Sequence, residues 1–434
     1  MPFQLVCMSE SLTQQIPTVS DLAENLVGSE IIKIAGEINA RIADGEDITN
    51  LTIGDFNPSI YPLPKGLLNE IIAAYEAGHT NYPQANGMEV LREAVSGYIA
   101  DRQQLNYSKE DILISGGARP LIYAAYRALV NQGEKVIFPI PSWNNNHYTY
   151  LNSAQAVEID CTPENKFLPT ADDLKAHVQD AALVALCSPL NPTGTSFSKK
   201  ALEDICDLII AENKRRVGQK PLYLLYDQIY WALTLGKTKH YDPVSLRPEM
   251  REYTIYVDGI SKAFAATGVR VGWAFGPNKV MAKMRALLSH VGAWSPKPEQ
   301  IATAAFLKHT GAVEATIQKH RDMISERVNK LFNGFSALRE VGFPVDAIQA
   351  EGAMYLTVKI DLVGKTTSDG EVLHDAQDIT MFLIKRAKVG IVPFYCFGGS
   401  RQSPWFRISV GTLQVEQIST VVENLREALS QFKK

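Results

Sequence analysis

Short apolar runs alternate with amphipathic segments between about residue 65 and residue 310. In the amphipathic segments apolar residues recur every three or four positions, as in Leu67, Ile71 and Tyr75, and this spacing predicts helices with one buried face. The apolar runs have the length of buried strands and cover residues 135–138, 156–159, 183–187, 222–226, 253–257 and 271–275. Strands that alternate with helices predict an α/β fold, with a mostly parallel sheet covered by helices on both faces.

The pattern changes after about residue 310. We expect a long helix over residues 313–339, a strand over 354–360, a helix over 376–388, short strands near Ile391 and over 406–410, and a final helix. This mixture predicts a smaller α+β domain. The chain is therefore expected to divide into an N-terminal segment, 1–64, a large domain, 65–310, and a small C-terminal domain, 311–434. A helix at about 29–42 in the first segment is expected to pack with the small domain.

Composition narrows the class of protein. The chain has 434 residues, 46% hydrophobic and 21% charged, which is typical of a soluble enzyme with more than one core. Its net charge of −4 gives no electrostatic reason for binding nucleic acid. Its five cysteines, Cys7 among them, include no CxxC pair that would indicate a disulfide scaffold or zinc site. No signal peptide or membrane span is evident. We expect a cytoplasmic enzyme without metal, nucleic acid or membrane partners.

The candidate chemistry centres on Lys262, which follows the predicted strand 253–257 and precedes Arg270 by eight residues. A lysine at the end of a buried strand is poorly solvated, and desolvation lowers its pKa and makes it a nucleophilic amine. Such lysines form Schiff bases with carbonyl compounds, pyridoxal phosphate included. The alternative is a surface loop that contains one lysine and one arginine.

Other strand ends carry groups that a pyridoxal phosphate site needs. Asp227 follows the strand 222–226, where its carboxylate could pair with the pyridine nitrogen. Tyr230, one helical turn on, and Asn191, in the Pro-rich loop after strand 183–187, could hydrogen-bond the ring oxygen. Each has an ordinary alternative: a turn aspartate, a packing tyrosine and a generic turn.

A turn of small residues is the candidate phosphate cradle. Gly116, Gly117 and Ala118 join the apolar run 112–114 to a helix that Pro120 can open. Their backbone N–H groups could close around a phosphate at the positive end of that helix, with Arg270 as the matching charge. Any tight connection between a strand and a helix would also suit these residues.

Trp143 and Arg407 complete the candidate site. Trp143 follows the strand 135–138 and could stack on a cofactor ring, although a core tryptophan is an equal alternative. Arg407 lies among apolar residues in a run that resembles a strand, so it needs a partner. A substrate carboxylate would satisfy it, and so would a structural Asp or Glu.

The order and spacing of these motifs resemble those of the class I aminotransferases of the aspartate aminotransferase superfamily, pyridoxal phosphate enzymes of fold type I. The resemblance runs from about residue 50 to residue 410, and its most specific part is the stretch from Lys262 through the GVRVG sequence that begins at Gly268. It implies a large cofactor-binding domain with a smaller α+β domain, and a homodimer with shared active sites.

The resemblance also assigns roles. It implies that Lys262 binds the cofactor aldehyde and later moves a proton, that Asp227 pairs with the ring nitrogen, that Tyr230 and Asn191 bind the ring oxygen, and that Trp143 stacks on the ring. Phosphate contacts would come from Gly116, Gly117, Ala118, Ser261, Arg270 and, from the neighbouring subunit, Tyr82. The substrate would contact Arg407, the backbone of Gly54, Trp143 and Asn191.

The chain also departs from the family pattern. Gly259 stands where many relatives have a serine that contacts the phosphate, and Ala118 lacks a side-chain donor. Relatives specific for dicarboxylates often carry a second arginine from the partner subunit, but residues 289–297 contain none. The candidates that could shape the pocket for the substrate side chain instead are His290, Trp294, Lys297 and Arg119.

The leading interpretation is ping-pong transamination between an L-amino acid and a 2-oxo acid, with aspartate-type or aromatic substrates favoured. A C–S β-lyase of the same fold is one alternative, because both reactions begin with removal of the α-proton. A non-catalytic ligand sensor is another, although the intact Lys262 argues against it. A dinucleotide-binding enzyme is disfavoured because no GxGxxG sequence opens the first strand–helix unit.

Overall fold

The computed structural model describes residues 18–432; residues 1–17, with Cys7, and residues 433–434 lie outside it. Its larger sheet has seven strands in the order β2-β8-β7-β6-β5-β3-β4. Neighbouring strands are parallel except for β8, which is antiparallel to both β2 and β7. The prediction of a mostly parallel sheet is confirmed. The strands are β2 (Ile112–Ser115), β3 (Lys135–Ile140), β4 (Gln155–Asp160), β5 (Ala181–Cys187), β6 (Tyr223–Asp227), β7 (Thr254–Gly259) and β8 (Gly272–Phe275).

Helices cover both faces of this sheet, because its central strands are apolar on both sides. On β6, Leu225 packs into a cluster with α5 (Ala118–Leu129) and α11 (Asn278–Val291). Its neighbour Leu224 points the other way, into a cluster with the helices of the opposite face. Those helices are α3 (Lys65–Glu76), α4 (Glu89–Gln103), α8 (Lys199–Arg215) and α12 (Lys297–Leu307), and shorter helices in this region are α6 (Asn145–Leu151), α7 (Ala171–Lys175), α9 (Pro243–Leu246) and α10 (Ile260–Ala263).

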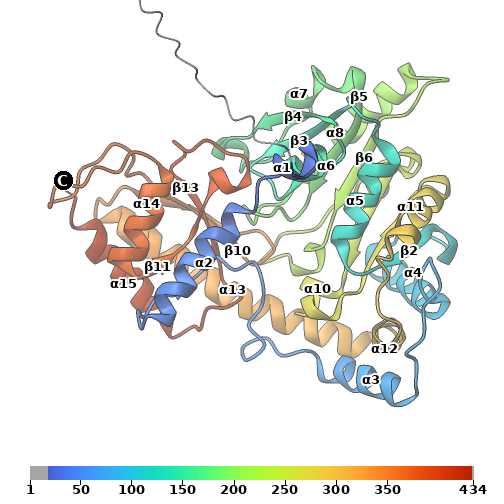
Figure 1. Ribbon diagram of the computed structural model, residues 1–434, viewed down its shortest axis with the longest axis horizontal. Helices are drawn as coiled ribbons and strands as arrows, with labels where there is room; N and C mark the ends of the chain where they lie inside the picture. The colour runs from blue at the N-terminus through green and yellow to red at the C-terminus, as the bar shows by residue number, and fades with distance from the viewer. Residues whose placement is uncertain (1–17, 433–434) are drawn as a thin grey trace, which may run out of the picture.

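The second sheet is smaller and antiparallel, in the order β12-β13-β10-β9. The segment expected as one helix over 376–388 is α14 (Ala376–Phe382) followed by a π-helical turn, Leu383–Ala387. In Figure 1 this sheet and its helices lie on the left, and α13 runs from them toward the large sheet on the right. The remaining elements are β9 (Val345–Ile348), β10 (Tyr355–Ile360), β11 (Val389–Gly390), β12 (Val392–Pro393), β13 (Trp405–Ser409), α13 (Thr310–Glu340) and α15 (Gln417–Leu429).

The N-terminal segment contacts the C-terminal part of the chain. It holds α1 (Asp21–Glu24) and α2 (Glu30–Ala43), and its β1 (Thr49–Asn50) pairs in parallel with β11. Ile34 and Ile38 of α2 pack against Ile384. Helix α13 contributes to both large cores, with Ile317 in the first and Ile324 in the second. The proposed division at residues 64 and 310 stays a prediction.

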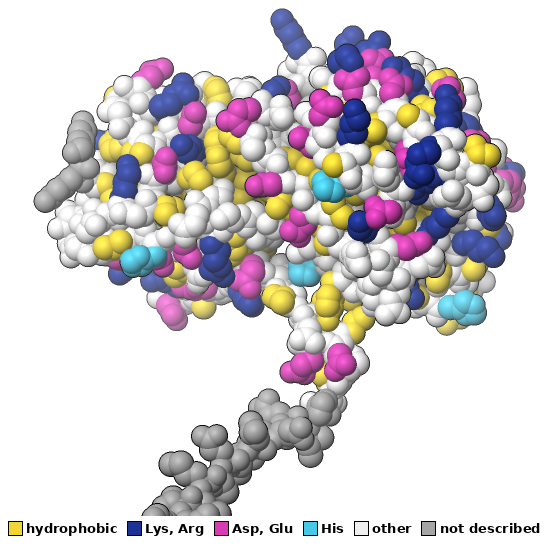
Figure 2. All heavy atoms as spheres, turned by 90° about the horizontal axis from the view of Figure 1, so that it is seen from above, with side chains coloured by type: hydrophobic (Ala, Val, Ile, Leu, Met, Phe, Trp, Pro, Cys, Tyr) yellow, Lys and Arg dark blue, Asp and Glu magenta, His cyan; other side chains and the backbone are white. Residues whose placement is uncertain are grey.

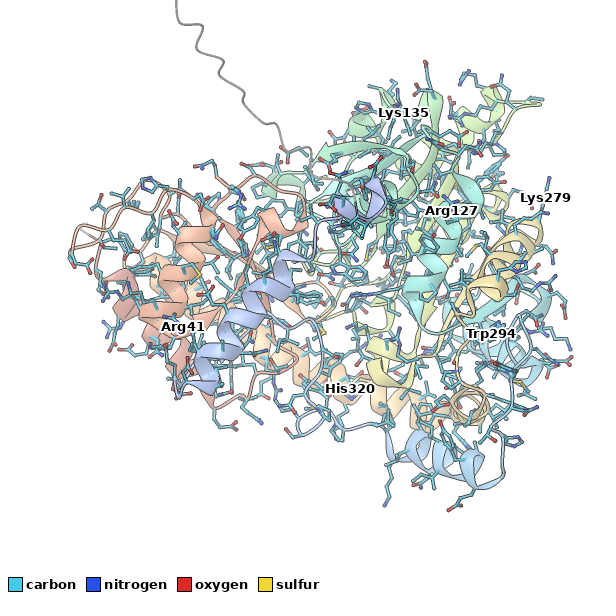
Figure 3. The ribbon with its side chains drawn as sticks, in the orientation of Figure 1. Arg41, Arg127, Lys135, Lys279, Trp294 and His320 are labelled. Atoms are coloured by element: carbon cyan, nitrogen blue, oxygen red, sulfur yellow. The ribbon has the colours of Figure 1, made fainter. Side chains whose placement is uncertain are left out.

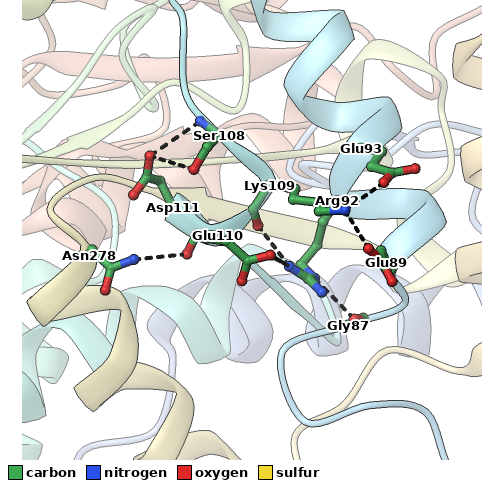
Figure 4. Close-up of polar contacts among 9 residues, drawn as sticks. All are labelled: Gly87, Glu89, Arg92, Glu93, Ser108, Lys109, Glu110, Asp111 and Asn278. Carbon is green, nitrogen blue, oxygen red and sulfur yellow. Dashed lines mark hydrogen bonds and ion pairs between the residues drawn. The ribbon is translucent and has the colours of Figure 1, made fainter.

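A buried arginine fixes the start of β2, whose other end carries the predicted cradle turn. Arg92 of α4 is 5% exposed and donates to the carbonyl oxygens of Gly87 and Lys109 (Figure 4). Ser108 and Asp111 form a capping box just before the strand. These contacts hold the chain where it enters the sheet, so the turn at the carboxyl end of β2 has a defined position.

The surface in Figure 2 carries Lys, Arg, Asp and Glu side chains that are mixed over the visible face, without a broad area of one sign. Within residues 18–432, no helix combines the length and apolar character needed to cross a bilayer.

Candidate active site

A cavity of about 600 Å³ lies at the carboxyl ends of β5, β6 and β7, where ligands of open α/β sheets bind. Residues far apart in the sequence line it together: the loops of the large sheet, the small sheet and the N-terminal segment all contribute. The predicted site residues that line it are Gly54, Ala118, Trp143, Asn191, Asp227, Tyr230, Ser261, Lys262, Arg270 and Arg407. Gly116, Gly117 and Tyr82 do not line it.

Lys262 lies on α10, the short helix that follows β7 directly. Its Nζ donates a hydrogen bond to the carbonyl oxygen of Gly54, at 2.7 Å. Burial lowers the pKa of Lys262 to about 8; Asp55 opposes this shift, and the positive charges of the cavity arginines add to it. An appreciable fraction of the side chain is therefore a neutral amine near pH 8, as a nucleophile requires.

Asp227 is the last residue of β6 and has no cationic partner within residues 18–432. Burial raises the pKa of its carboxyl to about 6, while the hydrogen bond from the Ile229 N–H and the charge of Lys262 act in the opposite direction. A protonated ring nitrogen beside this carboxylate would satisfy its charge. The hydrogen bond from the Ile229 N–H also gives Asp227 a role in the turn after β6. This role does not compete with cofactor binding, because a carboxylate can accept several hydrogen bonds.

The expectation that Tyr230 lies one helical turn from Asp227 is wrong. Asp227 Oδ1 accepts from the Ile229 N–H at 3.0 Å, and this contact makes a turn before the 3₁₀ helix Trp231–Leu233 begins. The Tyr230 hydroxyl still reaches the cavity, where it shares a 2.6 Å hydrogen bond with the hydroxyl of Tyr355.

Arg407 is 2% exposed on β13, and no carboxylate within the described chain pairs with it. Its Nη2 donates to the carbonyl oxygen of Thr52 at 2.6 Å, and its Nη1 donates to Oδ1 of Asn191 at 3.0 Å. The guanidinium lies 4.6 Å from the ring centre of Tyr355, and its buried Nε has no hydrogen-bond partner. A structural Asp or Glu therefore does not neutralise Arg407 within residues 18–432, which leaves a bound carboxylate as the partner of matching charge.

The contacts of Arg407 also set the roles of two neighbours. Because Asn191 Oδ1 accepts from Arg407, the amide N–H₂ of Asn191 remains available as a donor. A side chain at Gly54 would place its Cβ 2.9 Å from the Tyr355 hydroxyl and 3.6 Å from Arg407 Nη1. The absence of a side chain at Gly54 therefore keeps this end of the cavity open.

The turn before α5 has the tight geometry of a cradle, but its donors differ from the expected ones. Gly117 has a left-handed φ of 98°, and a Cβ there would lie 2.3 Å from Arg270 Nη2. The N–H groups of Gly116 and Gly117 donate to the carbonyl oxygens of Ala293 and Ser115. The N–H groups left for a phosphate are those of the first turn of α5, beginning with Ala118.

Arg270 stands beside this turn and supplies its positive charge. Its Nη2 donates to the Gly116 carbonyl oxygen at 2.7 Å and its Nη1 to the Thr267 carbonyl oxygen at 2.8 Å. Gly259 stands where many relatives have a serine, and the structure gives a steric reason. A Cβ at this position would lie 2.7 Å from the carbonyl oxygen of Val271. Ser261, the serine that the resemblance assigns to the phosphate, lines the cavity.

The sequence did not indicate several cavity residues. Tyr355 of β10 faces Tyr230 and Arg407, and Thr267 Oγ1 donates to Asp55 Oδ1 at 2.8 Å. Ile31 and Ile32, near the start of α2, also line the cavity. The one local sign that Tyr355 could belong to the site was its place as a tyrosine in an apolar strand. Nothing in the local sequence indicated a site role for the other residues named here.

Tyr82 lies outside the cavity and is 83% exposed. Its ring meets that of Trp294 edge-on, with 5.4 Å between the ring centres. The Tyr82 hydroxyl therefore does not serve the cavity of its own chain, and its position leaves it accessible to a second subunit.

Residues 46–425 match the family described as Aminotransferase class I and II. The chain belongs to this family. A protein named "Probable aspartate/prephenate aminotransferase" from Rickettsia felis is 28% identical over 382 residues, which are 86% of this chain and 87% of that protein. The aspartate aminotransferase of Bacillus sp. (strain YM-2) is 26% identical over 395 residues, 90% of this chain and 93% of its own.

Solved structures share the fold over nearly the full length. The aspartate aminotransferase from Rhizobium meliloti has a TM-score of 0.87 at 24% identity, covering 96% of this chain and 99% of that one. The aromatic aminotransferase from Pyrococcus horikoshii OT3 has a TM-score of 0.78 at 25% identity, covering 91% and 98%. The chain is thus a pyridoxal phosphate-dependent aminotransferase, which acts on amino acids and 2-oxo acids.

The residues present fit this cofactor. The cavity offers a buried amine at Lys262, a buried carboxyl without a cationic partner at Asp227, and a helix start beside Arg270. A Cβ at Gly117 would collide with the Arg270 guanidinium, so glycine at this position allows Arg270 to stand beside the turn. These groups match the aldehyde, the ring nitrogen and the phosphate of pyridoxal phosphate.

Proposed function

We propose that this aminotransferase uses an L-amino acid with an aspartate-type or aromatic side chain as donor and a 2-oxo acid as acceptor, in a ping-pong mechanism. The observation that carries this proposal is the buried Arg407 guanidinium, without a carboxylate partner in the described chain, in the same cavity as Lys262 and Asp227. The names of the relatives, aspartate/prephenate, aspartate and aromatic aminotransferase, support the choice of substrates.

In this mechanism pyridoxal phosphate, when bound, supplies an aldehyde that takes up the amino group and a ring that accepts electrons from the substrate. Lys262 Nζ would remove the α-proton of the donor and carry it to the aldehyde carbon of the cofactor within the same half-reaction, and it would move a proton in the reverse direction, to the α-carbon of the acceptor, in the second half. Asp227 stabilises positive charge at its end of the cavity. Tyr230 and Asn191 offer hydrogen-bond donors in the space between Asp227 and Arg407. Arg407 binds the α-carboxylate, so that the α-carbon faces Lys262.

Replacing Arg407 by alanine is expected to weaken carboxylate substrates by about 2–5 kcal/mol, the range for truncating one member of a buried charge pair. At about 1.4 kcal/mol per tenfold, kcat/KM falls roughly 30- to several-thousand-fold. Steady-state kinetics measure the loss, and the absorption spectrum should show that cofactor remains bound. Arg401→Ala is the matched control, because Arg401 also lies over a tyrosine ring but is exposed outside the cavity. Parallel loss of cofactor and activity in Arg407→Ala would mean that Arg407 is structural.

The dependence on a 2-oxo acid separates transamination from C–S β-lyase chemistry. A transaminase stops after one turnover when the amino acid is supplied alone, whereas a lyase continues and releases ammonia. Assays of ammonia release with and without 2-oxoglutarate therefore test the reaction class.

We propose further that the active unit is a homodimer in which Tyr82 completes the site of the neighbouring subunit. Three apolar side chains of α3, Leu68, Ile72 and Tyr75, are exposed, as is Val291 at the end of α11. Exposed apolar groups of this kind mark protein contacts, and a two-fold axis makes each subunit's contribution reciprocal.

Mixing two inactive variants should restore activity if Tyr82 crosses the interface. In a heterodimer of Lys262→Ala with Tyr82→Ala, both defects fall in one site, and the other site keeps its own Lys262 and an intact Tyr82 from the partner. Activity should return to up to about half of wild type, since a C₂ dimer has two equivalent sites. Lys262→Ala mixed with Arg407→Ala is the control that should recover little. Isolated heterodimers without recovery, despite a severe Tyr82→Ala defect, would place Tyr82 in its own site.

A further inference from the structure

A second cavity, of about 390 Å³, lies apart from the active site, where α4, α12 and α13 come together (Figure 1). None of the residues that line it also lines the active-site cavity. Its wall combines an aromatic hydroxyl, the start of a long helix and side chains of both charges. These groups differ from those of the cofactor site, so the cavity needs an explanation of its own.

Tyr98 of α4 brings an unused hydrogen-bond donor to the wall of this cavity. The residue is 6% exposed, and its ring meets those of Trp231 and Trp273 edge-on, with 5.8 and 6.1 Å between the ring centres. The hydroxyl forms no hydrogen bond with any residue between 18 and 432. Burial raises the pKa of Tyr98, so the hydroxyl stays protonated, and the charges of Arg102 and Glu314 in the cavity wall also act on it. A buried donor without an acceptor is costly, and a bound anionic group would satisfy it.

The start of α13 supplies backbone donors to the same cavity. No side chain caps this helix, and the N–H groups of Ala312 and Val313 both donate to the carbonyl oxygen of His309. The N–H groups of Thr310 and Gly311, which line the cavity, have no acceptor within the described part of the chain. The positive end of a helix of 31 residues favours a carboxylate at these N–H groups.

Charged side chains of both signs complete the wall. The Arg102 guanidinium lies 5.6 Å from the ring centre of Tyr98, and its Nη1 donates to Glu314 Oε2 at 2.5 Å. Asp101 is exposed and forms no ion pair with residues 18–432. A simple anion would be repelled by the carboxylates of Asp101 and Glu314, and a simple cation would leave the donors at Tyr98 and the helix start unused. A ligand that carries both charges would satisfy both sets of groups.

We propose that this cavity is a second binding site, which takes a small α-amino acid in its zwitterionic form. The N–H groups at the start of α13 and the Tyr98 hydroxyl bind the carboxylate, with Arg102 beside them. The carboxylates of Asp101 and Glu314 attract the ammonium group. Leu307 and Val313 also line the cavity, so a short apolar side chain has apolar neighbours there. The inference does not depend on which donor the catalytic site uses.

The test measures binding to the cofactor-loaded enzyme after reduction with borohydride, because reduction removes the aldehyde with which an amino acid would otherwise react. Calorimetry gives the Kd of alanine, of propionate, which lacks the ammonium group, and of ethylamine, which lacks the carboxylate. Tyr98→Phe removes only the hydroxyl without a partner. Tyr107→Phe is the matched control, because Tyr107 is 3% exposed and its hydroxyl also lacks a partner, but it does not line the cavity.

Alanine should bind the reduced wild-type enzyme saturably, and propionate and ethylamine should bind more weakly. Tyr98→Phe is expected to raise the Kd of alanine by about 10- to 150-fold, the loss associated with a hydrogen bond to a charged group. Its Tm should stay near wild type, and Tyr107→Phe should change the Kd by no more than about twofold. Glu314→Gln should raise the Kd of alanine by up to about fivefold, as for an exposed charge pair, without weakening propionate.

Three results would overturn the inference. Alanine that binds the wild-type and Tyr98→Phe enzymes equally would have its site elsewhere. Propionate that binds as tightly as alanine would make this an anion site, and ethylamine that binds as tightly would make it a cation site. Absence of saturable alanine binding at millimolar concentrations would leave the cavity without this ligand. The reduced enzyme cannot transaminate, so these outcomes are separate from any failure of the proposed function.

Discussion

Replacing Lys262 by alanine is expected to abolish transamination, with kcat/KM reduced by at least about 10⁴-fold, the upper range for loss of a general acid–base catalyst. Lys262 lines the cavity with its Nζ 2.7 Å from the Gly54 carbonyl oxygen, and no other lysine of residues 18–432 lines that space. The same amine is proposed to hold the cofactor and to move the α-proton, so its loss removes both contributions. Kinetics with aspartate and 2-oxoglutarate measure the effect.

Lys279→Ala is the matched control for this prediction. Lys279 is an exposed lysine at the start of α11 (Figure 3), far from the cavity lining. Its removal should leave kcat/KM and thermal stability near wild type. Lys262→Ala should also keep its fold, because the side chain fills little of either hydrophobic core. A Lys262→Ala protein that is folded and retains more than about a tenth of wild-type activity would contradict the assignment.

Asp227→Ala is expected to lower kcat by roughly 150- to 5,000-fold, which corresponds to about 3–5 kcal/mol for one partner of a buried ion pair. The ring nitrogen would lose its pairing with the Asp227 carboxylate, and the ring would accept electrons less readily. The contacts at the cradle turn and Arg270 remain, so part of the cofactor should stay bound. Asp227→Asn keeps the shape of the side chain and should lose activity as well. Wild-type kcat in either variant would show that Asp227 is only a turn residue.

Asp227 should also destabilise the cofactor-free protein near neutral pH. Burial raises the pKa of its carboxyl from 3.8 to about 6, so folding favours the protonated form. Ionisation of Asp227 therefore lowers the free energy of unfolding. This loss is absent below pH 3.8 and grows to about 3 kcal/mol as the pH rises through 6, because the pKa shift is about two units and each unit corresponds to about 1.36 kcal/mol. Asp227→Asn should therefore raise the Tm of the cofactor-free protein at pH 8 and change it little at pH 4.

The fold was predictable because the central strands are buried on both faces, which makes them continuous apolar runs such as the one that becomes β6. The direction of β8 was not apparent from its own residues. The connection from Gly259 to Gly272 holds only α10 and a 3₁₀ turn, so the chain lacks the covering helix that a parallel return requires and comes back antiparallel.

The candidate site was predictable where one residue follows one strand, as Asp227 follows β6 and Lys262 follows β7. Contacts that join distant parts of the chain were not predictable from local patterns. Tyr355 is 125 residues from Tyr230, and Thr267 is 212 residues from Asp55. The N–H of Gly116 looked free for a phosphate, but its acceptor, the carbonyl oxygen of Ala293, lies just beyond the C-terminal end of α11.

The central claim is that Lys262 is the lysine that carries the cofactor, and borohydride reduction followed by peptide mapping tests it most directly. The purified protein should be yellow, and reduction should fix the cofactor covalently and bleach that colour. After digestion, the account predicts a pyridoxyl group on Lys262 and on no other lysine. A pyridoxyl group on a different lysine, or complete cofactor binding with no labelled peptide, would contradict it.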